Sequence, residues 1–462
     1  MLLKVINIKK YILYVRCKMS GNNKEIWDSF IELEKKHNLF ELVDKNGLYY
    51  WDLIRFYIYF KLLYKNQKDN LLSIKKESVF KKIMAKVRML LDYFLLKFDF
   101  SNKEFLFYIA SRDKINNKLF FDKNSKATSD LIPGYCKCIV ESYNSRVSNS
   151  YFLPQIIFRR FFKYENYDFT ELMKLLSNEF GELNFNGEEL SNILNSYYAD
   201  YKFFYGLLKR KNIQKVFITQ NGIQKGLIKA AKDLNITSYE FQHGVVNKGH
   251  LAYHYPDIKY KKGQVILPDN ILSLSDFWFK ELHCPNVNIL PIGNDYFYSP
   301  ITKAEKSNMN VGITVISTDI FGEYLSNFII KLKKNTRNDE MIYFKLHPNQ
   351  FNEKVFYEDK FKDFHNVNVI SNELSVGELL QKTDTLFTIL STAVYEALQA
   401  KKKVILLKRN PYLHLEHVFD HPNLYLVNNV EEFVEAKNKN INADINVEYF
   451  SPFNPKKVLE IL

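Results

Sequence analysis

A chain of 462 residues is too long for one hydrophobic core of ordinary size, so we expect two α/β domains and an additional segment. The sequence is 46% hydrophobic and 16% aromatic, which excludes a disordered or low-complexity chain. Its formal net charge of +13 suits an anionic partner such as a nucleotide, a phosphorylated lipid or an acidic membrane, although a lysine-rich genome would produce the same charge.

The cysteines are too few and too scattered to form a disulfide framework: they are Cys17, Cys136, Cys138 and Cys284. This usage favours a reducing compartment. Neither a secretion signal nor a stretch of about 18 uncharged apolar residues can be recognised in the sequence. We therefore expect a cytoplasmic protein.

Residues 1–100 have a mostly helical pattern that differs from the rest of the chain. In the segment 78–98, basic residues alternate with a broad apolar face. Such a helix either packs on a domain or lies in a membrane interface, and packing is the more common outcome. We predict peripheral contact of this helix with the inner face of the cytoplasmic membrane, through five basic residues: Lys81, Lys82, Lys86, Arg88 and Lys97.

From residue 103 onward, short apolar runs alternate with helical patterns, which predicts parallel sheets in an α/β fold. We expect two Rossmann-like domains, over 101–305 and 306–462, preceded by the helical segment 1–100. The polar stretch 301–310 is the predicted linker, and the last residues of the chain should form a helix that can pack back across the lobes. Strands are predicted at 104–110, 215–220, 237–242, 265–275, 311–317, 341–346, 367–370, 385–390 and 403–407.

Ligands of open parallel sheets bind beyond the carboxyl ends of the strands, so candidate residues are sought there. The predicted strand 237–242 ends in Gln242 and is followed directly by His243 and Gly244. We predict that Gln242 and Gly244 contact a substrate or donor. His243 is the first catalytic candidate, and Gly244 is predicted to allow a tight departure of the backbone. The next loop is predicted to grip a substrate through four polar or aromatic side chains: His250, Tyr253, His254 and Tyr255.

The second domain offers a matching element. The predicted strand 341–346 is followed by His347 and Pro348, and the proline keeps its predecessor extended at the carboxyl edge. Strand alternation places Lys345 on the same face as His347. His347 is the second catalytic candidate, and Lys345 is predicted to contact the donor. Two histidines are therefore expected to face one another from opposite lobes.

Another strand of the second domain passes into a helix through Ser391 and Thr392. A hydroxyl at the start of a helix, together with unpaired backbone amides, favours an anion such as phosphate, although serine commonly caps a helix without binding a ligand. Glu396 lies one turn further on and is a candidate acceptor for ribose hydroxyls.

The motifs FQHG (241–244), KLHPN (345–349) and ILSTAVYEALQAKKKVILL (389–407) occur in an order that resembles GT-B transferases of bacterial capsule, lipopolysaccharide and teichoic acid synthesis. The pattern is similar to HP-motif sialyltransferases and to CDP-glycerol glycerophosphotransferases. The resemblance covers about residues 100–450. It implies a glycosyltransferase whose C-terminal lobe holds a CMP-, CDP-, UDP- or GDP-linked sugar near His347, Ser391 and Thr392. His243 would be the general base for a glycan or lipid-linked acceptor.

The sequence departs from both families: no paired-acid motif is recognised in the first domain, and Phe241-Gln242 replaces a tryptophan before the His-Gly pair. A CDP-polyol phosphotransferase and a nucleotide-sugar 2-epimerase therefore stay open as alternatives. We predict no required cofactor and no metal site, although Asp269 and Asp276 leave room for a divalent cation. A nucleic-acid-binding protein is the remaining alternative, but the basic residues form no recognition element, so we predict no nucleic-acid partner.

Overall fold

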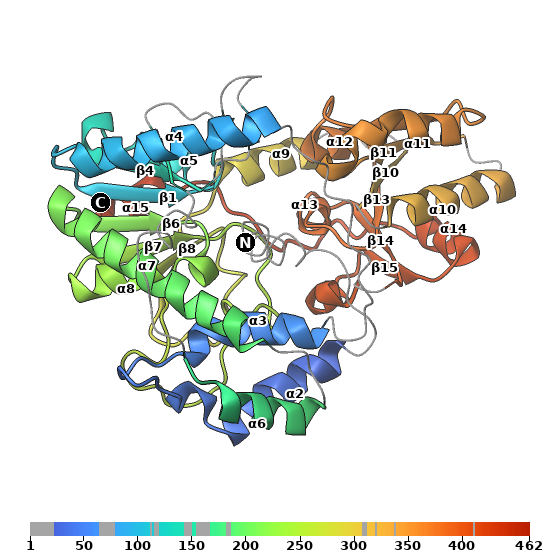
Figure 1. Ribbon diagram of the computed structural model, residues 1–462. Coiled ribbons are helices and arrows are strands. Elements are labelled where there is room, and N and C mark those ends of the chain that lie inside the picture. The colour runs from blue at the N-terminus through green and yellow to red at the C-terminus, as the bar shows by residue number, and fades with distance from the viewer. Residues whose placement is uncertain are drawn as a thin grey trace.

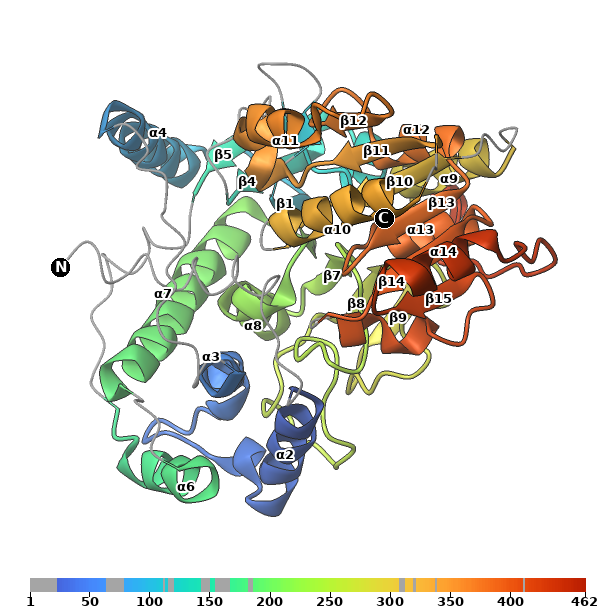
Figure 2. The same ribbon diagram turned by 90° about the vertical axis from the view of Figure 1, so that its right-hand side faces the viewer.

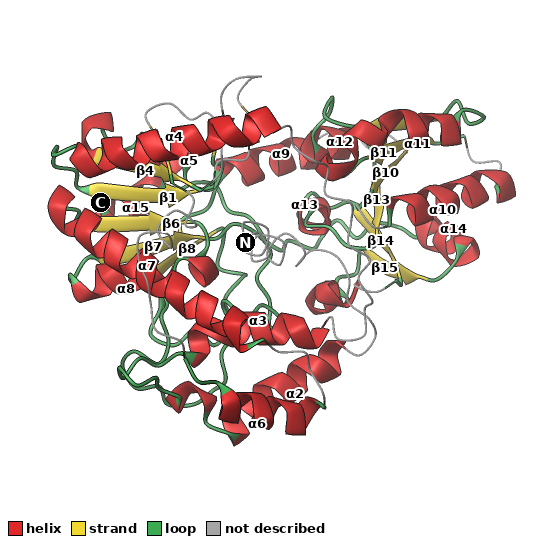
Figure 3. Cartoon of the chain, in the orientation of Figure 1, coloured by secondary structure: helices red, strands yellow, loops and turns green. Residues whose placement is uncertain are grey.

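The computed structural model describes residues 23–63, 79–110, 113–114, 120–142, 150–153, 167–181, 186–306, 312–318, 321–336, 339–409 and 412–462. Within these ranges the chain forms two lobes, each built on a parallel sheet with helices on both sides (Figures 1 and 3). The predicted α/β class, with two sheet domains and a helical N-terminal segment, is confirmed. Buried apolar strands such as FLFYI and KVILL explain the parallel arrangement, because strands covered on both faces read as continuous hydrophobic runs.

The described strands of the first sheet follow the order β5-β4-β1-β6-β7-β8-β9 and pair in parallel. A short antiparallel pair, β2 (Asp113–Lys114) and β3 (Phe120–Phe121), lies in the connection after β1. The sheet strands are β1 (Phe105–Ile109), β4 (Lys137–Glu141), β5 (Ser150–Phe152), β6 (Lys215–Ile218), β7 (Thr237–Phe241), β8 (Asn270–Ser273) and β9 (Asn288–Pro291).

The described strands of the second sheet follow the order β12-β11-β10-β13-β14-β15, again with parallel pairing throughout. The chain passes from the central strand β10 outward to β12 and then returns to β13 on the other side. This reversal places a topological switch point between β10 and β13. The strands are β10 (Gly312–Ile316), β11 (Met341–Lys345), β12 (Val367–Ile370), β13 (Thr385–Thr388), β14 (Lys403–Leu407) and β15 (Leu424–Val427).

The described helices surround both sheets and also form a separate group beneath the first one. α2 and α6 lie together, away from both sheets, in the two views of Figures 1 and 2. The helices are α2 (Asn23–Lys36), α3 (Trp51–Leu63), α4 (Val79–Phe98), α5 (Lys126–Asp130), α6 (Thr170–Phe180), α7 (Gly187–Lys211), α8 (Lys225–Asp233), α9 (Asp295–Lys306), α10 (Gly322–Asn335), α11 (Lys354–Phe361), α12 (Val376–Lys382), α13 (Ala393–Gln399), α14 (Val430–Asn438) and α15 (Pro455–Ile461).

The predicted linker 301–310 is wrong for residues 301–306, because these continue α9. Polar composition suggested a loop, but Ile301 is buried and the helix packs against α12 and α13 of the second lobe. Tertiary contact therefore outweighs the weak local pattern. The domain boundary at 305/306 stays a prediction.

The C-terminal helix α15 packs against the first sheet, with Val458 buried in a cluster that includes Phe217 of β6. The segment leading to it runs beside the connection from β9 to α9. Asn294 donates its backbone N–H to Ser451, and Asn454 donates to Ile292, at N···O distances of 2.9 and 2.7 Å. Two crossings of the chain between the lobes are thereby hydrogen-bonded to each other.

Gly293 is required at this crossing. Its φ is +69°, a conformation that L side chains rarely adopt, and a Cβ built on it would lie 2.0 Å from the carbonyl oxygen of Pro452. Because that atom belongs to the backbone of the second crossing, a side chain at position 293 would push the two crossings apart.

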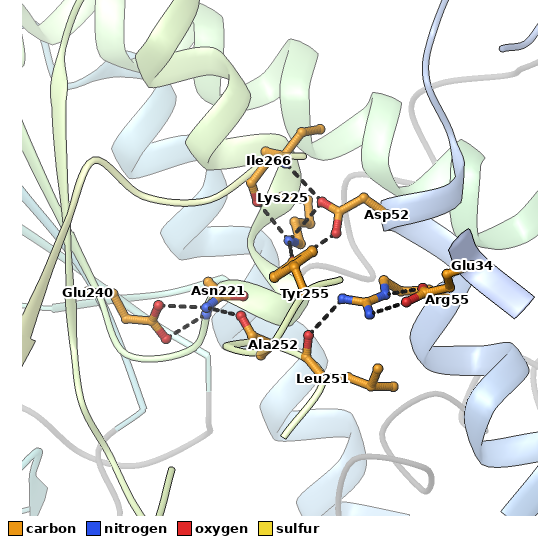
Figure 4. A network of polar contacts seen from close by, with 10 residues as sticks. All are labelled: Glu34, Asp52, Arg55, Asn221, Lys225, Glu240, Leu251, Ala252, Tyr255 and Ile266. Atoms are coloured by element: carbon orange, nitrogen blue, oxygen red, sulfur yellow. Dashed lines mark hydrogen bonds and ion pairs between the residues drawn. The ribbon is translucent and has the colours of Figure 1, made fainter. Parts of the chain in front are cut away.

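The N-terminal helices α2 and α3 are joined to the first lobe by buried charges (Figure 4). Arg55 donates to both carboxylate oxygens of Glu34 at 2.8 Å and to the carbonyl of Leu251 at 3.0 Å, and both ionic side chains are fully buried. Lys225 of α8 likewise donates to Asp52 of α3 at 2.9 Å. These contacts make the helical segment part of the same packed unit as the loop that follows β7.

Candidate functional site

The carboxyl edge of the first sheet faces the second lobe. At the opposite, amino-terminal edge, Lys215 at the start of β6 donates to the carbonyl of Leu462, and the C-terminus lies on the side of the first lobe away from the second (Figure 1). Asn247, in the loop after β7, donates through Nδ2 to the carbonyl of His414 at 2.9 Å, and His414 follows β14. Loops that leave the carboxyl ends of strands in separate sheets are therefore in direct contact, where α/β proteins bind ligands.

His243 lies directly beyond β7 and its side chain is half-buried. Its position is fixed by Gln242, whose side chain is buried and bridges two loops: Nε2 donates to the carbonyl of Gly244 at 2.9 Å, and Oε1 accepts from the backbone N–H of Leu274 at 3.0 Å. Gln242 is thus a positioning residue in this structure. The predicted contact of Gln242 with a ligand stays a prediction.

Gly244 does not occupy the positive-φ region. The backbone at this position therefore does not use the positive-φ freedom of glycine, and the predicted contact of Gly244 with a ligand stays a prediction. A Cβ added at this position would meet no atom of the described residues within 4 Å. This space leaves the backbone beside His243 open to the approach of another molecule.

The loop after His243 is held from beneath by buried polar groups. Glu240 of β7 accepts hydrogen bonds from the Tyr253 hydroxyl at 2.6 Å and from the side-chain amide of Asn221 at 2.7 Å (the contact with Asn221 is drawn in Figure 4). Burial raises the pKa of Glu240, and these hydrogen bonds oppose the shift. Tyr255 donates to Asp52 at 2.9 Å.

Tyr253 and Tyr255 are each 1% exposed. The prediction that they grip a substrate is therefore wrong: their hydroxyls satisfy buried carboxylates, and their rings belong to the core. His250 and His254 of the same loop are half-buried.

His347 lies beyond β11 and is half-buried. It has an extended conformation, with φ −65° and ψ 146°, and Pro348 begins the short helix η5 (Pro348–Glu353) after it. Its Nδ1 accepts from the backbone N–H of Asn349 at 3.3 Å, which turns the imidazole toward the start of η5. The local sequence therefore fixes His347 at the carboxyl edge, as the His-Pro pair predicts. That His243 and His347 face one another stays a prediction.

Lys345 is half-buried, and its ammonium donates to the carbonyls of Ser371 and Leu374 in the connection between β12 and α12. Burial lowers the pKa of this lysine. In this structure the ammonium braces a loop of the second lobe, so a phosphate would have to compete with two backbone acceptors for it. The predicted donor contact stays a prediction.

Ser391, Thr392 and Glu396 come together where β13 passes into α13. The Ser391 hydroxyl accepts from the N–H of Ala393 at 3.2 Å, while Thr392 is exposed. Glu396 is half-buried, and burial raises the pKa of its carboxyl to about 7, an effect that the positive charge of Lys123 opposes. Lys123 belongs to the first lobe, so a charge of one lobe acts on a carboxyl of the other.

Two residues near this edge escaped the sequence prediction. Lys123 follows a short hairpin in a polar stretch without periodicity, and nothing local marks it. His414, by contrast, lies in the short helix η6 (Tyr412–Val418) that comes after the strand KVILL, so only a search of the whole segment beyond that strand could have selected it. Burial lowers the pKa of both His250 and His414 to about 4, and in His250 the charge of His414 adds to the effect. Both histidines are therefore neutral near pH 7.

Asp269 does not serve a cation site at the carboxyl edge. It precedes β8, at the opposite edge of the sheet, and accepts from the Lys232 ammonium at 2.7 Å and from the Ser238 N–H at 2.8 Å. Asp276 is exposed. Among the described residues, no group of three or more His, Cys, Asp or Glu side chains could hold a metal ion.

A hollow of about 500 Å³ lies beside η5 in the second lobe. Gln350, Gly322 and Tyr357 line it together with two carboxylates, Glu323 and Glu353. Because two carboxyl groups line this hollow, it disfavours a phosphate, and we place the candidate site at the interlobe edge instead.

Comparison of the sequence with protein-family models and with curated proteins finds no match. Among solved structures, a UDP-GlcNAc 2-epimerase from Methanocaldococcus jannaschii is similar at 15% identity and a TM-score of 0.44, covering 78% of this chain and 98% of its own. MurG from Acinetobacter baumannii is similar at 8% identity and 0.42, with the same coverage. A UDP-GlcNAc 2-epimerase from Neisseria meningitidis has 13% identity and 0.41, covering 72% of this chain and 90% of its own. Likeness at this level assigns no activity.

Proposed function

We propose that the protein is a glycosyltransferase that moves a sugar from a nucleotide-activated donor to a capsule or lipopolysaccharide glycan. The observation that carries the proposal is the meeting of two carboxyl sheet edges, with His243 at one and His347, Ser391 and Glu396 at the other. The order of the three motifs that resemble surface-polysaccharide transferases agrees with this placement.

His243 would act as general base. As the acceptor hydroxyl attacks the anomeric carbon, its proton passes to the imidazole while the bond from that carbon to the phosphate oxygen breaks. A histidine suits this task because its ordinary pKa lies near neutral pH. The open backbone at Gly244 gives the acceptor room beside the imidazole.

The leaving nucleoside phosphate needs its charge neutralised. We assign this task to His347 and to the donors around Ser391 and Thr392, with Glu396 accepting hydrogen bonds from ribose hydroxyls. No step in this scheme requires a metal ion.

A thermal-shift screen with CMP, CDP, UDP and GDP tests the donor assignment, because a ligand that binds only the native state raises the melting temperature. We expect one nucleotide to stabilise the protein and the double variant Ser391→Ala, Thr392→Ala to lose most of that shift. Ser375→Ala, which removes a comparable helix-capping hydroxyl elsewhere in the second lobe, is the matched control. Equal shifts in wild type and double variant would contradict the donor site.

A nucleotide-sugar 2-epimerase is the second candidate. The observation that favours it is the Glu396 carboxyl, whose pKa of about 7 suits proton transfer at neutral pH. Product analysis separates the two reactions: an epimerase converts a nucleotide sugar without acceptor and takes up solvent deuterium, whereas the proposed transferase releases nucleotide only with an acceptor. His243→Asn should slow the transfer reaction by about 10²- to 10⁴-fold.

A CDP-polyol phosphotransferase stays an alternative within the same screen. Stabilisation of the protein by CDP alone, together with the appearance of donor phosphorus in the reaction product, would favour polyol-phosphate transfer over sugar transfer.

A further inference from the structure

α4 leaves a long apolar face uncovered by the described residues. It lies at the outer edge of the first lobe in both views (Figures 1 and 2). Large apolar side chains along this face are 44–74% exposed, counting Phe100 just beyond the helix: they are Ile83, Met84, Val87, Leu90, Leu91, Phe94, Leu95, Phe98 and Phe100. Soluble monomers rarely expose a contiguous patch of this kind without a partner.

Packing against the sheet does not explain this face. Only Met89 and Leu96 are buried among the helix residues from 83 to 98. Asp92 fixes the inner side, where its carboxylate accepts from Arg88 at 3.3 Å and from the N–H of Phe152 in β5 at 2.7 Å. Ala85 and Tyr93 also pack against the core of the first lobe from this inner side. The helix is therefore anchored through its inner side, and the apolar stripe is turned away from the lobe.

The charge on the exposed face is entirely positive. From residue 83 to 98, every exposed position is either apolar or lysine, the lysines being Lys86 and Lys97. The prediction that Arg88 belongs to this face is wrong, because Arg88 donates to Asp92 on the inner side, and the side chains of Lys81 and Lys82 lie outside the described residues. The single acidic residue of α4, Asp92, belongs to the inner side. A helix of 20 residues is about 30 Å long, so the stripe presents an extended surface rather than a point.

We propose that this face of α4 binds reversibly to an anionic lipid bilayer by lying in its interface. Apolar side chains would enter the acyl boundary while the lysines meet the headgroups. No helix among the described residues is long and apolar enough to span a membrane. The inference goes beyond the proposed reaction and does not depend on it.

Charge complementarity favours a lipid bilayer over two other partners that could cover this face, a second copy of the chain and residues 1–22 of the same chain. A second copy of the chain would bring lysines against lysines without an acidic residue on either exposed face. Residues 1–22, which lie outside the described residues, contain five basic and no acidic side chains, so they would add like charge. An anionic bilayer supplies the negative charge that complements the lysines of this face.

Co-sedimentation of the full chain with phosphatidylglycerol vesicles and with phosphatidylcholine vesicles tests the proposal. We expect binding to the anionic vesicles that weakens as salt rises. The triple variant Leu91→Gln, Phe94→Gln, Leu95→Gln should lower the partition coefficient by on the order of 100-fold. The double variant Lys86→Gln, Lys97→Gln should lower it by on the order of 30-fold on anionic vesicles and little on neutral ones.

Matched controls come from elsewhere on the surface. Val43→Gln, Val355→Gln, Leu459→Gln removes three side chains that are 50–69% exposed, against 49–60% for the α4 triple. Lys174→Gln, Lys261→Gln removes the same charge as the α4 lysine pair, from exposed ion pairs. Both controls should bind as wild type does.

Three results of the vesicle assay would overturn the inference: no binding of wild type to anionic vesicles, equal binding of the α4 triple variant and wild type, or equal loss in the control triple. A melting temperature that falls by several degrees in the α4 triple alone would also overturn it, because the face would then be packed against other parts of the chain. A dimer in light scattering that the α4 triple dissociates would assign the face to a second copy.

Discussion

Arg55→Met probes the buried charge network that joins the N-terminal helices to the loop after His243. The substitution keeps most of the side-chain volume but leaves the Glu34 carboxylate with Trp51 Nε1, at 2.7 Å, as its remaining partner in the network. It also removes the donor to the carbonyl of Leu251. Breaking a fully buried pair by removing one partner costs about 3 to 5 kcal/mol.

The loss should depend on pH. Burial already raises the pKa of Glu34, and Arg55 opposes that shift, so removing Arg55 raises the pKa further. A carboxyl whose pKa is raised in the folded state lowers the free energy of unfolding as pH rises above the pKa that the group has in the unfolded chain. We therefore expect the deficit of the variant to be smaller near pH 5 and larger near pH 8.

Urea unfolding followed by tryptophan fluorescence measures the effect. Trp27 and Trp51 lie in the hydrophobic core that α2 and α3 share with the first lobe, whereas Trp278 packs against Tyr395 of the second lobe. We expect the free energy of unfolding to fall by about 3 to 5 kcal/mol. Lys229→Met, which breaks an exposed ion pair with Asp233, is the control and should change the free energy of unfolding by less than about 0.5 kcal/mol. The double variant Glu34→Leu, Arg55→Met should lose less than Arg55→Met alone. A single-variant loss below about 1 kcal/mol would refute the reasoning.

Two further predictions follow. Gly293→Ala should destabilise the protein by more than about 2 kcal/mol, because residue 293 has a positive φ and a Cβ there would clash with the Pro452 carbonyl. Gly134→Ala, which has open space for a Cβ, should cost far less. Similar melting temperatures for the two variants would contradict the crossing geometry. Glu396→Gln should raise the melting temperature at pH 8 and leave it unchanged near pH 4.5. A carboxyl whose pKa is raised to about 7 in the folded state lowers the stability of the protein as pH rises from the ordinary carboxyl pKa through 7. A gain in melting temperature that is the same at both pH values would exclude this titration.

The sequence predicts the strands well where burial alone decides them. β14 has the predicted bounds, and β1 lies within the predicted 104–110. α9 was missed because its sequence is polar and carries Pro300 in its interior, so contacts with α12, which lie far along the chain, decide its structure. Local pattern carries no information about such contacts.

The candidate site divides in the same way. Strand ends followed by His243 and His347 could be located from apolar runs and from the His-Pro pair. The roles of Gln242 and Tyr255 could not, because each depends on a distant partner: Gln242 on Leu274, and Tyr255 on Asp52, 203 residues away. A polar or aromatic loop beside a candidate catalytic residue therefore does not distinguish side chains that meet a ligand from side chains that satisfy buried charges.

The N-terminal segment combines two opposite uses of charge. α3 buries Asp52 and Arg55, whose partners fix the loop beyond His243, while the exposed charge of α4 is lysine alone. The two helices lie on opposite sides of the first lobe in both views (Figures 1 and 2), and the buried network and the exposed face have no residue in common. Effects at separate sites add, so Arg55→Met should lower stability without changing vesicle binding below the melting temperature, and the α4 triple variant should do the reverse. The N-terminal segment then contains two independent parts: a rigid support for the candidate site, and a surface whose side chains can be replaced without disturbing that support.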